Sequence, residues 1–576
     1  MKTPAKPSEL TQALSASREL FLHLAAFSFF VNLLMLTGPL YMLQVYDRVL
    51  ASQSVPTLLA LTGLVLALYG TLGVLEWVRS GLFGEAASRF EGFLGKRAAG
   101  SAFFASLSDG GQVSERPIRD LRQLRRFLSS SAMNAVFDAP WTPLFFLVLF
   151  MLHPAFGLWA LFGAIVLVVI GVVNQRASSR LMREAEDTER SSYLRANEMI
   201  RNAEVVDALG MHESVQSRWQ KEFDASDRAL SRSSRILSGF SSGTKAIRLF
   251  LQSAILGLGA YLAISGEASH GSMIAASILM GRAIAPIEQL VGQWRSIISA
   301  REAWRSLGGF IKLDPSSKDA MQLPPIKGQV SVEHIYAAPF GTKAPVLKSL
   351  VFSIGPGDVL GVLGPSASGK STLARVLTGV WPVLSGCVRI DGADIGSFPR
   401  ASLGPQLGYL PQQVDLMSGT IWDNIARYQP HAKPEAIIAA ANAAGCHELI
   451  LQLKDGYDTE IGMRGAYLSA GQRQRIGLAR ALFGNPNLVV LDEPNSNLDA
   501  DGEEALQRAI SGLKLRRATT VIIAHRPNAI IHCDKLLVLE NGEIRAFGAR
   551  DEVLEKVMPR RGSGNVTTIR PGEVNV

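Results

Sequence analysis

Long apolar stretches without charged residues dominate the first half of this chain and constrain its fold more than any other feature. They cover residues 20–46, 51–75, 139–175 and 249–266, and a further stretch, 272–294, is interrupted by Arg282 and Glu288. A helix needs about 20 residues to cross the hydrocarbon core of a bilayer. The stretch 139–175 is long enough for two crossings, with a turn at His153-Pro154 because proline interrupts a helix. We therefore predict six membrane-spanning helices.

The composition agrees with a membrane protein that has a soluble part. Only 19% of the 576 residues are charged, with 58 Lys and Arg against 50 Asp and Glu and a formal net charge of +8, whereas soluble domains have about 25%. Three cysteines, Cys387, Cys446 and Cys533, lie in the second half, which excludes a disulfide framework and indicates a reducing cytosol. We expect no nucleic-acid partner, because cytoplasmic membrane loops also collect Lys and Arg.

The loops between the apolar stretches predict the orientation in the bilayer. The short connections near 46–57, 153–154 and 266–271 contain one basic residue, Arg48, whereas the long connections 79–133 and 176–248 are rich in both charges. By the positive-inside rule, the N-terminal segment, both long loops and the C-terminal half face the cytoplasm. The first apolar stretch is too long for a signal peptide and a second follows at once, so we predict a retained membrane helix.

Three charged residues lie in or beside the apolar stretches, namely Asp138, Arg282 and Glu288. A charged side chain that faces lipid is costly. These residues therefore either form pairs between helices or line a polar translocation cavity. The sequence alone does not decide between the two alternatives.

A glycine-rich loop follows a short apolar strand in the second half of the chain. Residues 359–363, Val-Leu-Gly-Val-Leu, predict a buried strand, and residues 373–377 predict a helix. The loop between them is a P-loop, in which backbone N–H groups face phosphate oxygens. Lys370 is placed to neutralise the β- and γ-phosphates of ATP, and the Ser371 hydroxyl to bind Mg²⁺. The nucleotide-binding residues expected in this loop are Gly364, Pro365, Ser366, Ala367, Ser368, Gly369, Lys370, Ser371 and Thr372.

Two acidic residues close a second apolar strand. Residues 488–491, Leu-Val-Val-Leu, are followed by Asp492 and Glu493. This is the Walker B arrangement, in which Asp492 would hold Mg²⁺ and Glu493 would polarise the attacking water. An ordinary acidic strand end would not explain why the pair lies downstream of a P-loop. The two motifs together predict Mg²⁺-dependent ATP hydrolysis.

Further segments resemble the motifs of ATP-binding cassette (ABC) proteins, in the order found in that family. Residues 468–472, Leu-Ser-Ala-Gly-Gln, resemble the signature motif LSGGQ, with Ala470 in place of its first glycine. Gln412 resembles the Q-loop glutamine, Asp499 the D-loop aspartate and His525 the switch histidine. The resemblance implies an α/β P-loop cassette in which Gln412 also binds Mg²⁺, and in which Gln412 and His525 sense or position the γ-phosphate.

In this family the signature residues meet the nucleotide that is held by the opposite cassette. The resemblance therefore assigns Ser469, Ala470, Gly471, Gln472 and Asp499 to nucleotide binding, because the signature serine and the helix behind it form an anion site. With one P-loop and one signature per chain, we expect a homodimer with twelve spans and two composite sites. A heterodimer with a related half-transporter is the alternative.

Two positions depart from the family pattern or leave it open. Met463 stands where related exporters usually carry glutamate, which leaves open how that loop couples the cassette to the membrane helices. The aromatic residue that stacks on adenine is expected near the start of the cassette, where Tyr336 and Phe340 are the alternatives.

Helical turns in the long loops, near 100–106 and 202–211, are expected to transmit motion between the cassette and the membrane helices.

Six spans followed by a cassette are similar to the ABC exporters, and four segments resemble one branch of them. Residues 38–50, 137–143, 202–211 and 281–286 are similar to type I secretion ATPase/permeases, specifically the PrtD-type exporters of proteases and lipases. The resemblance implies an inner-membrane pump for unfolded polypeptides with uncleaved C-terminal signals, including protease, lipase or RTX-like cargo. It also implies a periplasmic membrane-fusion protein and an outer-membrane channel protein as partners.

The expected organisation is a cytoplasmic N-terminal segment (1–19), a transmembrane domain with long cytoplasmic helical extensions (20–312), a cassette (323–558) and a flexible tail (559–576). An exporter of lipid or small amphipathic molecules would share this fold. A membrane-anchored scaffold with an inactive cassette is a third possibility, which the presence of Lys370, Asp492, Glu493 and His525 argues against.

Overall fold

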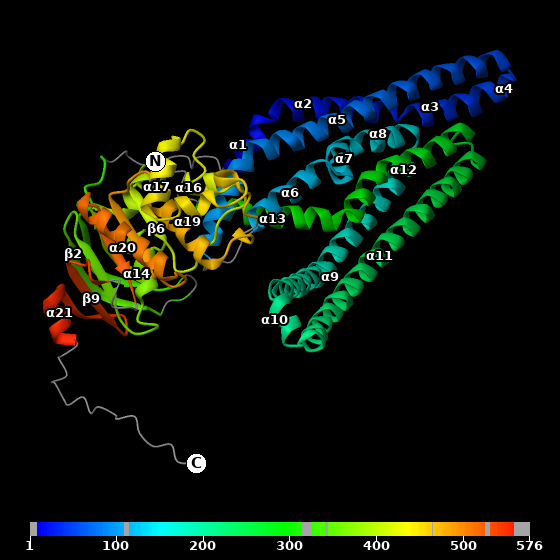
Figure 1. The fold of residues 1–576 in the computed structure, drawn as a ribbon. Helices are drawn as coiled ribbons and strands as arrows, with labels where there is room; N and C mark the ends of the chain where they lie inside the picture. Colours follow the sequence, from blue (N-terminus) through cyan, green and yellow to red (C-terminus); the bar gives the residue numbers. More distant parts are fainter. Residues whose placement is uncertain are drawn as a thin grey trace, which may run out of the picture. The chain divides into compact units, whose positions relative to one another are not determined.

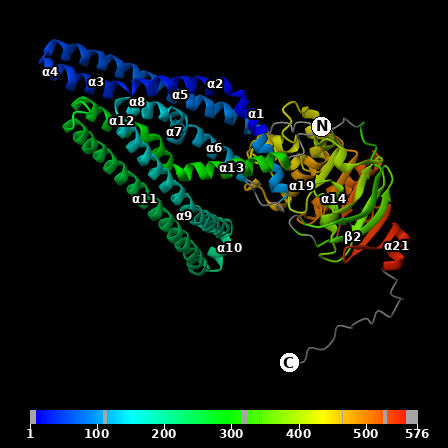
Figure 2. The same cartoon turned by 180° about the vertical axis from the view of Figure 1, so that it is seen from behind.

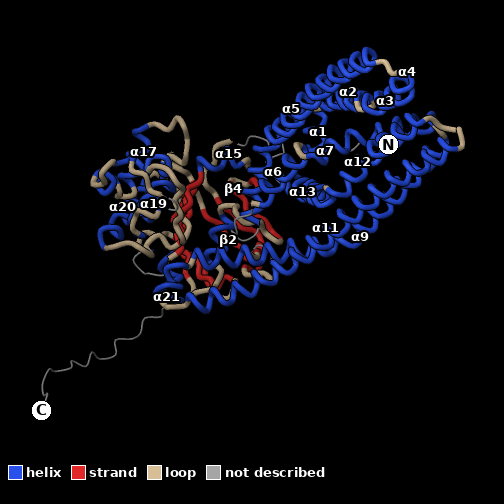
Figure 3. Tube along the Cα trace, turned by 90° about the vertical axis from the view of Figure 1, so that its right-hand side faces the viewer, coloured by secondary structure: helices blue, strands red, loops and turns tan. Residues whose placement is uncertain are grey.

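The computed structural model describes residues 9–108, 115–313, 324–339, 342, 344–462, 465–524 and 530–557. The chain divides into two compact units, residues 1–104 with 114–315 and residues 105–113 with 316–576. Among the described residues the first unit is helical, and the strands lie in the second unit (Figure 3).

Six helical segments of the described chain are long and apolar enough to cross a membrane, which confirms the predicted number. These segments are Arg18–Ser52, Val55–Leu107, Ser131–Leu152, Pro154–Arg201, His212–Ile264 and His270–Gly292. The helices that contain or flank them are α1 (Glu9–Ala16), α2 (Arg18–Leu34), α3 (Thr37–Gln44), α4 (Leu50–Ser52), α5 (Val55–Ser108), α6 (Arg116–Leu128), α7 (Ser131–Asp138), α8 (Thr142–Leu152), α9 (Pro154–Arg201), α10 (Ala203–Ala208), α11 (His212–Ile264), α12 (His270–Gly292) and α13 (Trp294–Leu313).

The turn predicted between the third and fourth spans is present. Helix α8 ends at Leu152, His153 is extended, and Pro154 begins α9, where its missing N–H group breaks no helical hydrogen bond. The third span starts earlier than its apolar stretch, at Ser131, because a 3₁₀ turn at Ala139–Trp141 joins α7 directly to α8.

The first span is less regular than its sequence predicts. Helix α2 ends at Leu34, α3 begins at Thr37, and a π-helix covers Val45–Val49. Within the π-helix, the Asp47 carboxylate accepts hydrogen bonds from the Ser269 hydroxyl at 2.6 Å and from the Gly271 N–H at 2.9 Å. These bonds tie the outer end of the first span to the start of α12, and they give Asp47, within the segment 38–50, a structural role.

Helices α9 and α11 are much longer than a membrane crossing requires. They contain 48 and 53 residues, which is roughly 70–80 Å at 1.5 Å per residue, against about 30 Å for the hydrocarbon core. They run side by side, with α10 joining their ends (Figures 1 and 2). Within the first unit, the pair therefore extends well beyond the apolar part of its own spans.

Two apolar clusters hold the first unit together. One, which includes Phe90 and Leu307, joins α1, α2, α5, α6, α7 and α13, whereas the other, which includes Phe145 and Met280, joins α8, α9, α11 and α12. Burial of each large apolar side chain stabilises such packing by about 1.5–3 kcal/mol in a soluble protein. In lipid, close packing and interhelical polar contacts take over that role.

Two charged residues that the sequence left open form pairs between helices. Asp138 of α7 accepts from Arg79 Nη1 of α5 at 2.8 Å and from Asn32 Nδ2 of α2 at 2.9 Å. Glu288 of α12 lies 2.9 Å from Arg248 Nε of α11. Both carboxylates are thus neutralised inside the helix bundle. Arg282, the remaining charged residue in question, has an exposed side chain.

The second unit contains two sheets and the helices that cover them. The antiparallel sheet has the order β2-β1-β4-β5, and the second sheet has the order β10-β9-β3-β8-β7-β6. The strands are β1 (Val330–Ala337), β2 (Leu347–Ile354), β3 (Val359–Leu363), β4 (Ser385–Ile390), β5 (Ala393–Asp394), β6 (Leu407–Leu410), β7 (Leu488–Asp492), β8 (Thr519–Ile523), β9 (Lys535–Glu540) and β10 (Glu543–Ala549). The helices are α14 (Lys370–Leu377), α15 (Arg400–Leu403), α16 (Ile421–Ile425), α17 (Pro434–Ala443), α18 (His447–Leu451), α19 (Ala470–Leu482), α20 (Ala500–Leu515) and α21 (Arg550–Val557).

Four neighbouring strands of the larger sheet, β3, β8, β7 and β6, are parallel. Strands β7 and β8 are buried along their whole length, as is β3 up to its last residue, which explains their continuous apolar sequences. Parallel strands bring their carboxyl ends to one edge, where open α/β sheets bind ligands. The segments that follow these strands therefore share an edge of the second unit.

Candidate active site

The P-loop lies between β3 and α14, as predicted. Gly364 and Gly369 have φ of +155° and +99°, conformations that favour glycine. A Cβ atom at Gly364 would lie 2.3 Å from the Leu539 carbonyl oxygen, and one at Gly369 would lie 2.6 Å from a methyl carbon of Leu347. Both glycines are therefore required for the loop to turn against the sheet.

Lys370 lies at the start of α14 and folds back over the loop. Its ammonium group donates to the carbonyl oxygens of Gly364 at 2.9 Å and Pro365 at 2.8 Å. Burial lowers the pKa of Lys370, while the nearby carboxylates of Glu493 and Asp492 oppose that shift. The two loop carbonyl oxygens thus hold the Lys370 ammonium group over the P-loop. A phosphate oxygen bound in the loop could take their place as the acceptor.

Ser371 and Asp492 bring two oxygen ligands together. The Ser371 hydroxyl donates to Asp492 Oδ1 at 3.3 Å. Asp492 is 1% exposed, and this burial raises the pKa of its carboxyl group. Hydroxyl and carboxylate oxygens are the ligands that Mg²⁺ prefers, so this pair could hold the ion.

Glu493 is the first residue after β7 and has the left-handed conformation, with φ of +49°. Its backbone N–H donates to the Ile523 carbonyl oxygen at 3.0 Å, which fixes it against the neighbouring strand β8. Gln412, two residues after the end of β6, donates from Nε2 to Glu493 Oε2 at 3.1 Å. The structure therefore places the Gln412 side chain beside Glu493, the residue expected to polarise the attacking water.

The residues around the P-loop fit a nucleotide phosphate. The hydroxyl of Ser368 is buried beside Gly364 and has no hydrogen-bond partner within the described residues. The N-cap of α14, Gly369, has no side chain to bond the first N–H groups of the helix, and such groups bind anions. Pro365, Ser366 and Ala367 are exposed, so a ligand can reach the loop.

The signature segment forms the N-terminus of α19. Ser469 is the N-cap: its hydroxyl accepts from the Gln472 N–H at 3.2 Å, and its own N–H donates to Gln472 Oε1 at 2.8 Å. Ala470 is the first helical residue and needs no positive φ, so alanine fits there. A Cβ atom at Gly471 would lie 3.0 Å from the Asn497 carbonyl oxygen, which makes glycine the better residue at that position.

Asp499 has partners of its own. Its carboxylate accepts from the Gly502 N–H at 2.9 Å, as N-cap of α20, and from the Arg475 guanidinium of α19. The bond from Gly502, followed by Arg475, lowers the pKa of Asp499. These contacts join the D-loop to the signature helix, and nucleotide contact by Asp499 stays a prediction.

Some residues singled out from the sequence lie outside the described residues: His525, Met463 and Phe340. Their roles stay predictions. Tyr336, the other candidate for the adenine platform, lies in β1 with 37% of its surface exposed. Its ring is therefore accessible for stacking.

Sequence reasoning missed Arg427, which organises this unit. Its guanidinium donates to the carbonyl oxygens of Gly404 and Leu407, near the start of β6, and of Arg480 and Ala481, at the end of α19. Burial lowers the pKa of Arg427 to about 10. No motif marks this residue, since its acceptors are backbone groups brought together only by folding.

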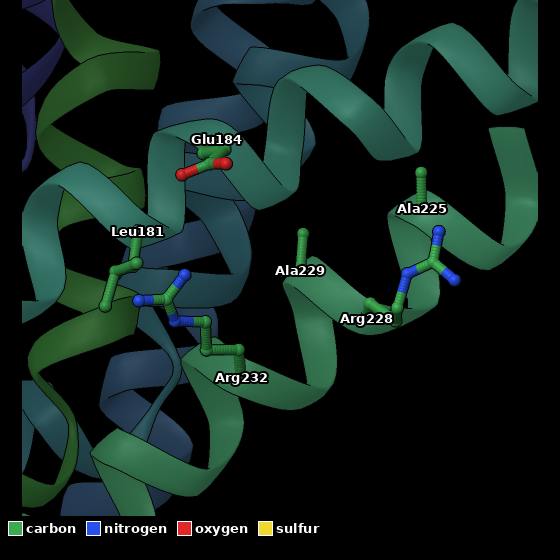
Figure 4. Close-up of a pocket in the computed structure, with 6 residues that line it drawn as sticks. All are labelled: Leu181, Glu184, Ala225, Arg228, Ala229 and Arg232. Carbon is green, nitrogen blue, oxygen red and sulfur yellow. The ribbon is translucent and has the colours of Figure 1, made fainter.

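A hollow of about 210 Å³ in the first unit shares no residue with these motifs (Figure 4). Leu181 and Glu184 line it from α9, and Arg228 and Arg232 from α11. The Arg232 side chain reaches toward α9, whereas that of Arg228 turns along its own helix. This hollow is separate from the candidate active site.

The fold and site together define an ABC transporter with six spans and a nucleotide-binding cassette. Residues 347–496 match the family model described as "ABC transporter", and residues 21–286 match the one described as "ABC transporter transmembrane region". A solved bacterial Atm1-family ABC exporter with ATP bound has a TM-score of 0.81 at 22% identity, covering 94% of this chain and 97% of that one. At this identity the likeness concerns the fold.

Comparison of sequences narrows the class. The chain is 42% identical over 554 residues to the type I secretion system ATP-binding protein PrsD of Rhizobium meliloti (strain 1021), covering 95% of this chain and 94% of that protein. It is 30% identical to the cyclolysin secretion/processing ATP-binding protein CyaB of Bordetella pertussis (strain Tohama I), covering 94% and 77%. The chain therefore belongs to the family of type I secretion ABC ATPases. It is a multi-pass membrane protein whose ATPase domain is cytoplasmic.

Proposed function

We propose that this protein uses ATP hydrolysis to export unfolded polypeptides from the cytoplasm in one step, as the inner-membrane pump of a type I secretion system. The proposal rests on one structural observation: the chain joins six spans to a cassette in which the P-loop, Asp492 and Glu493 lie at one sheet edge. The 42% identity to a type I secretion ATP-binding protein supports it. Export of lipid or small amphipathic molecules is not favoured by these relatives.

In the proposed cycle, the P-loop N–H groups and Lys370 bind the phosphates of ATP. Ser371, Asp492 and Gln412 are the proposed ligands of Mg²⁺, which would neutralise charge that develops on the phosphates. Glu493 accepts a proton from the attacking water, and its bond from Gln412 orients the carboxylate. His525 is proposed to position the γ-phosphate.

The proposed active unit is a homodimer. Ser469 and Ala470 of the signature are exposed, as are Pro365, Ser366 and Ala367 of the P-loop. In a head-to-tail pair of cassettes, each P-loop would meet the signature of the second copy. Asp499 would then stand beside that junction, held by Gly502 and Arg475.

The remaining partners follow from the family. We propose a periplasmic membrane-fusion protein and an outer-membrane channel protein as the path to the medium, and a C-terminal, uncleaved signal on the cargo. The proposed domain limits are 20–312 for the transmembrane domain and 323–558 for the cassette, with 1–19 and 559–576 as the terminal segments.

ATP hydrolysis by the purified protein in lipid nanodiscs tests the proposal. The probes are urea-unfolded polypeptides from the medium of the same cells, with the C-terminal segment intact or removed, and a panel of lipid compositions. We expect the intact polypeptides to change the rate and the truncated ones not to. A rate that responds to lipid composition alone would contradict polypeptide export.

A further inference from the structure

Helix α12 differs from the other spans in what its exposed face carries. The other five spans expose large apolar side chains, such as Leu66 on α5, Met151 on α8 and Ile165 on α9. Such faces suit lipid. Within the described residues, α12 exposes no large apolar side chain. The residues that it does expose are His270, Arg282, Gln289 and Gly292.

Arg282 lies deep in the membrane. It follows His270, the outer end of α12, by twelve residues, which is about 18 Å of helix against a hydrocarbon core of about 30 Å. Gln289 lies seven residues further on, two turns along the same face. The two residues form a polar stripe that runs from the middle of the membrane toward the cytoplasm. We call it the α12 stripe.

Arg282 has no carboxylate partner among the described residues. Its Nη1 atom lies 3.8 Å from the sulfur of Met35, the C-cap residue that follows α2 where the first span is interrupted. Helix interruptions at membrane depth occur where the backbone is buried in protein or lines a water-filled cavity. The charge and the interruption therefore lie side by side.

Several carboxylates in or next to the described spans have partners other than Arg282. Asp47 accepts from Ser269 and Gly271, Glu76 lies 3.9 Å from Arg79, and Asp138 pairs with Arg79. Glu267 lies 3.5 Å from His153, and Glu288 pairs with Arg248. An arginine that faces lipid at this depth is costly, so its guanidinium needs water or a ligand.

We propose that the α12 stripe lines the export path and that Arg282 binds carboxylate groups of the polypeptide as it passes. The planar guanidinium suits bidentate contact with a carboxylate, and the exposed Gln289 amide can bond the backbone of an extended chain. The inference rests on the proposed export of polypeptides. It adds to that function a residue that selects for acidic segments.

Thiol labelling tests whether water reaches the stripe. The membrane half of the chain contains no cysteine, and of the three in the cassette only Cys387 is not buried. In a Cys387→Ser background, R282C and Q289C should react with a charged, membrane-impermeant thiol reagent about tenfold or more faster than the matched control I165C, because a thiol in lipid does not ionise. Equal rates at all three positions, or a Q289C as slow as the control, would overturn the assignment of the stripe.

Secretion of an acidic cargo by Arg282 variants tests whether Arg282 binds carboxylate groups of the polypeptide. R282Q should lower secretion of an acidic cargo about tenfold or more, R282K should retain part of it, and both should keep the wild-type rate of ATP hydrolysis without cargo. Replacing Asp and Glu of the cargo by Asn and Gln should remove the difference between wild type and R282Q. Wild-type secretion by R282Q would overturn the role of Arg282, whereas a wild type that secretes no polypeptide would instead contradict the proposed function.

Discussion

In the cassette, charged side chains from separate motifs gather at one sheet edge, whereas in the membrane unit they are paired across helices. Burial raises the pKa of the Asp492 carboxyl group, and the hydrogen bond from the Ser371 hydroxyl opposes that shift only in part. By contrast, Asp138 is neutralised by Arg79 and bonded by Asn32. A charged group that binds a ligand thus lacks a neutralising partner in the protein, whereas a charged group that holds helices together has one. Arg282 lies in the membrane unit but resembles Asp492 in this respect, because no carboxylate among the described residues pairs with it.

The largest effect is expected at Glu493. Glu493→Gln keeps the shape and the contact with Gln412 but removes the proton acceptor, so the rate of ATP hydrolysis should fall by about 10²–10⁴-fold while ATP binding persists. Steady-state hydrolysis and filter binding of labelled ATP measure the two quantities. Glu504→Gln on α20, an exposed carboxylate that pairs with Arg508, is the control and should leave both unchanged. Substantial hydrolysis by the Glu493 variant would contradict its role.

The second effect is expected at the Arg79–Asp138 pair. Asp138→Leu leaves the buried Arg79 without its counterion, which should cost about 3–5 kcal/mol of stability. Thermal denaturation in detergent, followed by loss of the monodisperse protein, measures the change. The double variant Arg79→Met/Asp138→Leu should recover most of the loss, because no buried charge is then left unpaired. Glu76, which lies 3.9 Å from Arg79, has a side chain that is about half exposed and can be solvated.

The exposed pair Arg89–Glu85, with both side chains more than half exposed, is the control for this experiment. Arg89→Met should cost less than about 1 kcal/mol. Equal losses of stability at the two pairs would contradict the claim that a buried pair between helices contributes more than a surface pair.

The two units also differ in how much their sequences predict. The P-loop, the β7 carboxylates and the signature each lie in a contiguous motif, and the structure has the strand, loop and helix that each motif requires. Spans are likewise visible as apolar stretches. The pairs of Asp138 and Glu288 were not predictable, because their partners lie 59 and 40 residues away and only packing decides which charged residues meet.

A third prediction concerns pH. Because burial raises the pKa of Asp492, its carboxyl group takes up a proton at a higher pH than an ordinary aspartate does, and protonation competes with Mg²⁺. Below that pKa, the Mg²⁺ concentration for half-maximal hydrolysis should rise about tenfold per pH unit. Titrations of the ATPase rate with Mg²⁺ between pH 7 and the acid limit of folding measure this. A half-maximal concentration that does not change with pH would contradict the proposed Mg²⁺ ligand.

The smallest effect is expected at Ala470. Ala470→Gly restores the family residue, but alanine already fits the first helical position, so the ATPase rate should change by less than about twofold and stability by at most about 1 kcal/mol. Gly471→Ala is the comparison, because its Cβ atom would press on the Asn497 carbonyl oxygen at 3.0 Å. It should lower the ATPase rate more than Ala470→Gly. The reverse order would contradict the packing described for the signature.

Export of polypeptides driven by the cassette is the central claim, and quantitative proteomics of the culture medium tests it most directly. Cells with the wild-type protein are compared with cells that carry Lys370→Ala, which removes the cation that bonds the P-loop carbonyls. We predict the loss from the medium of one or a few full-length polypeptides, uncleaved at both ends. An unchanged set of secreted proteins, while purified wild-type protein hydrolyses ATP, would contradict the claim.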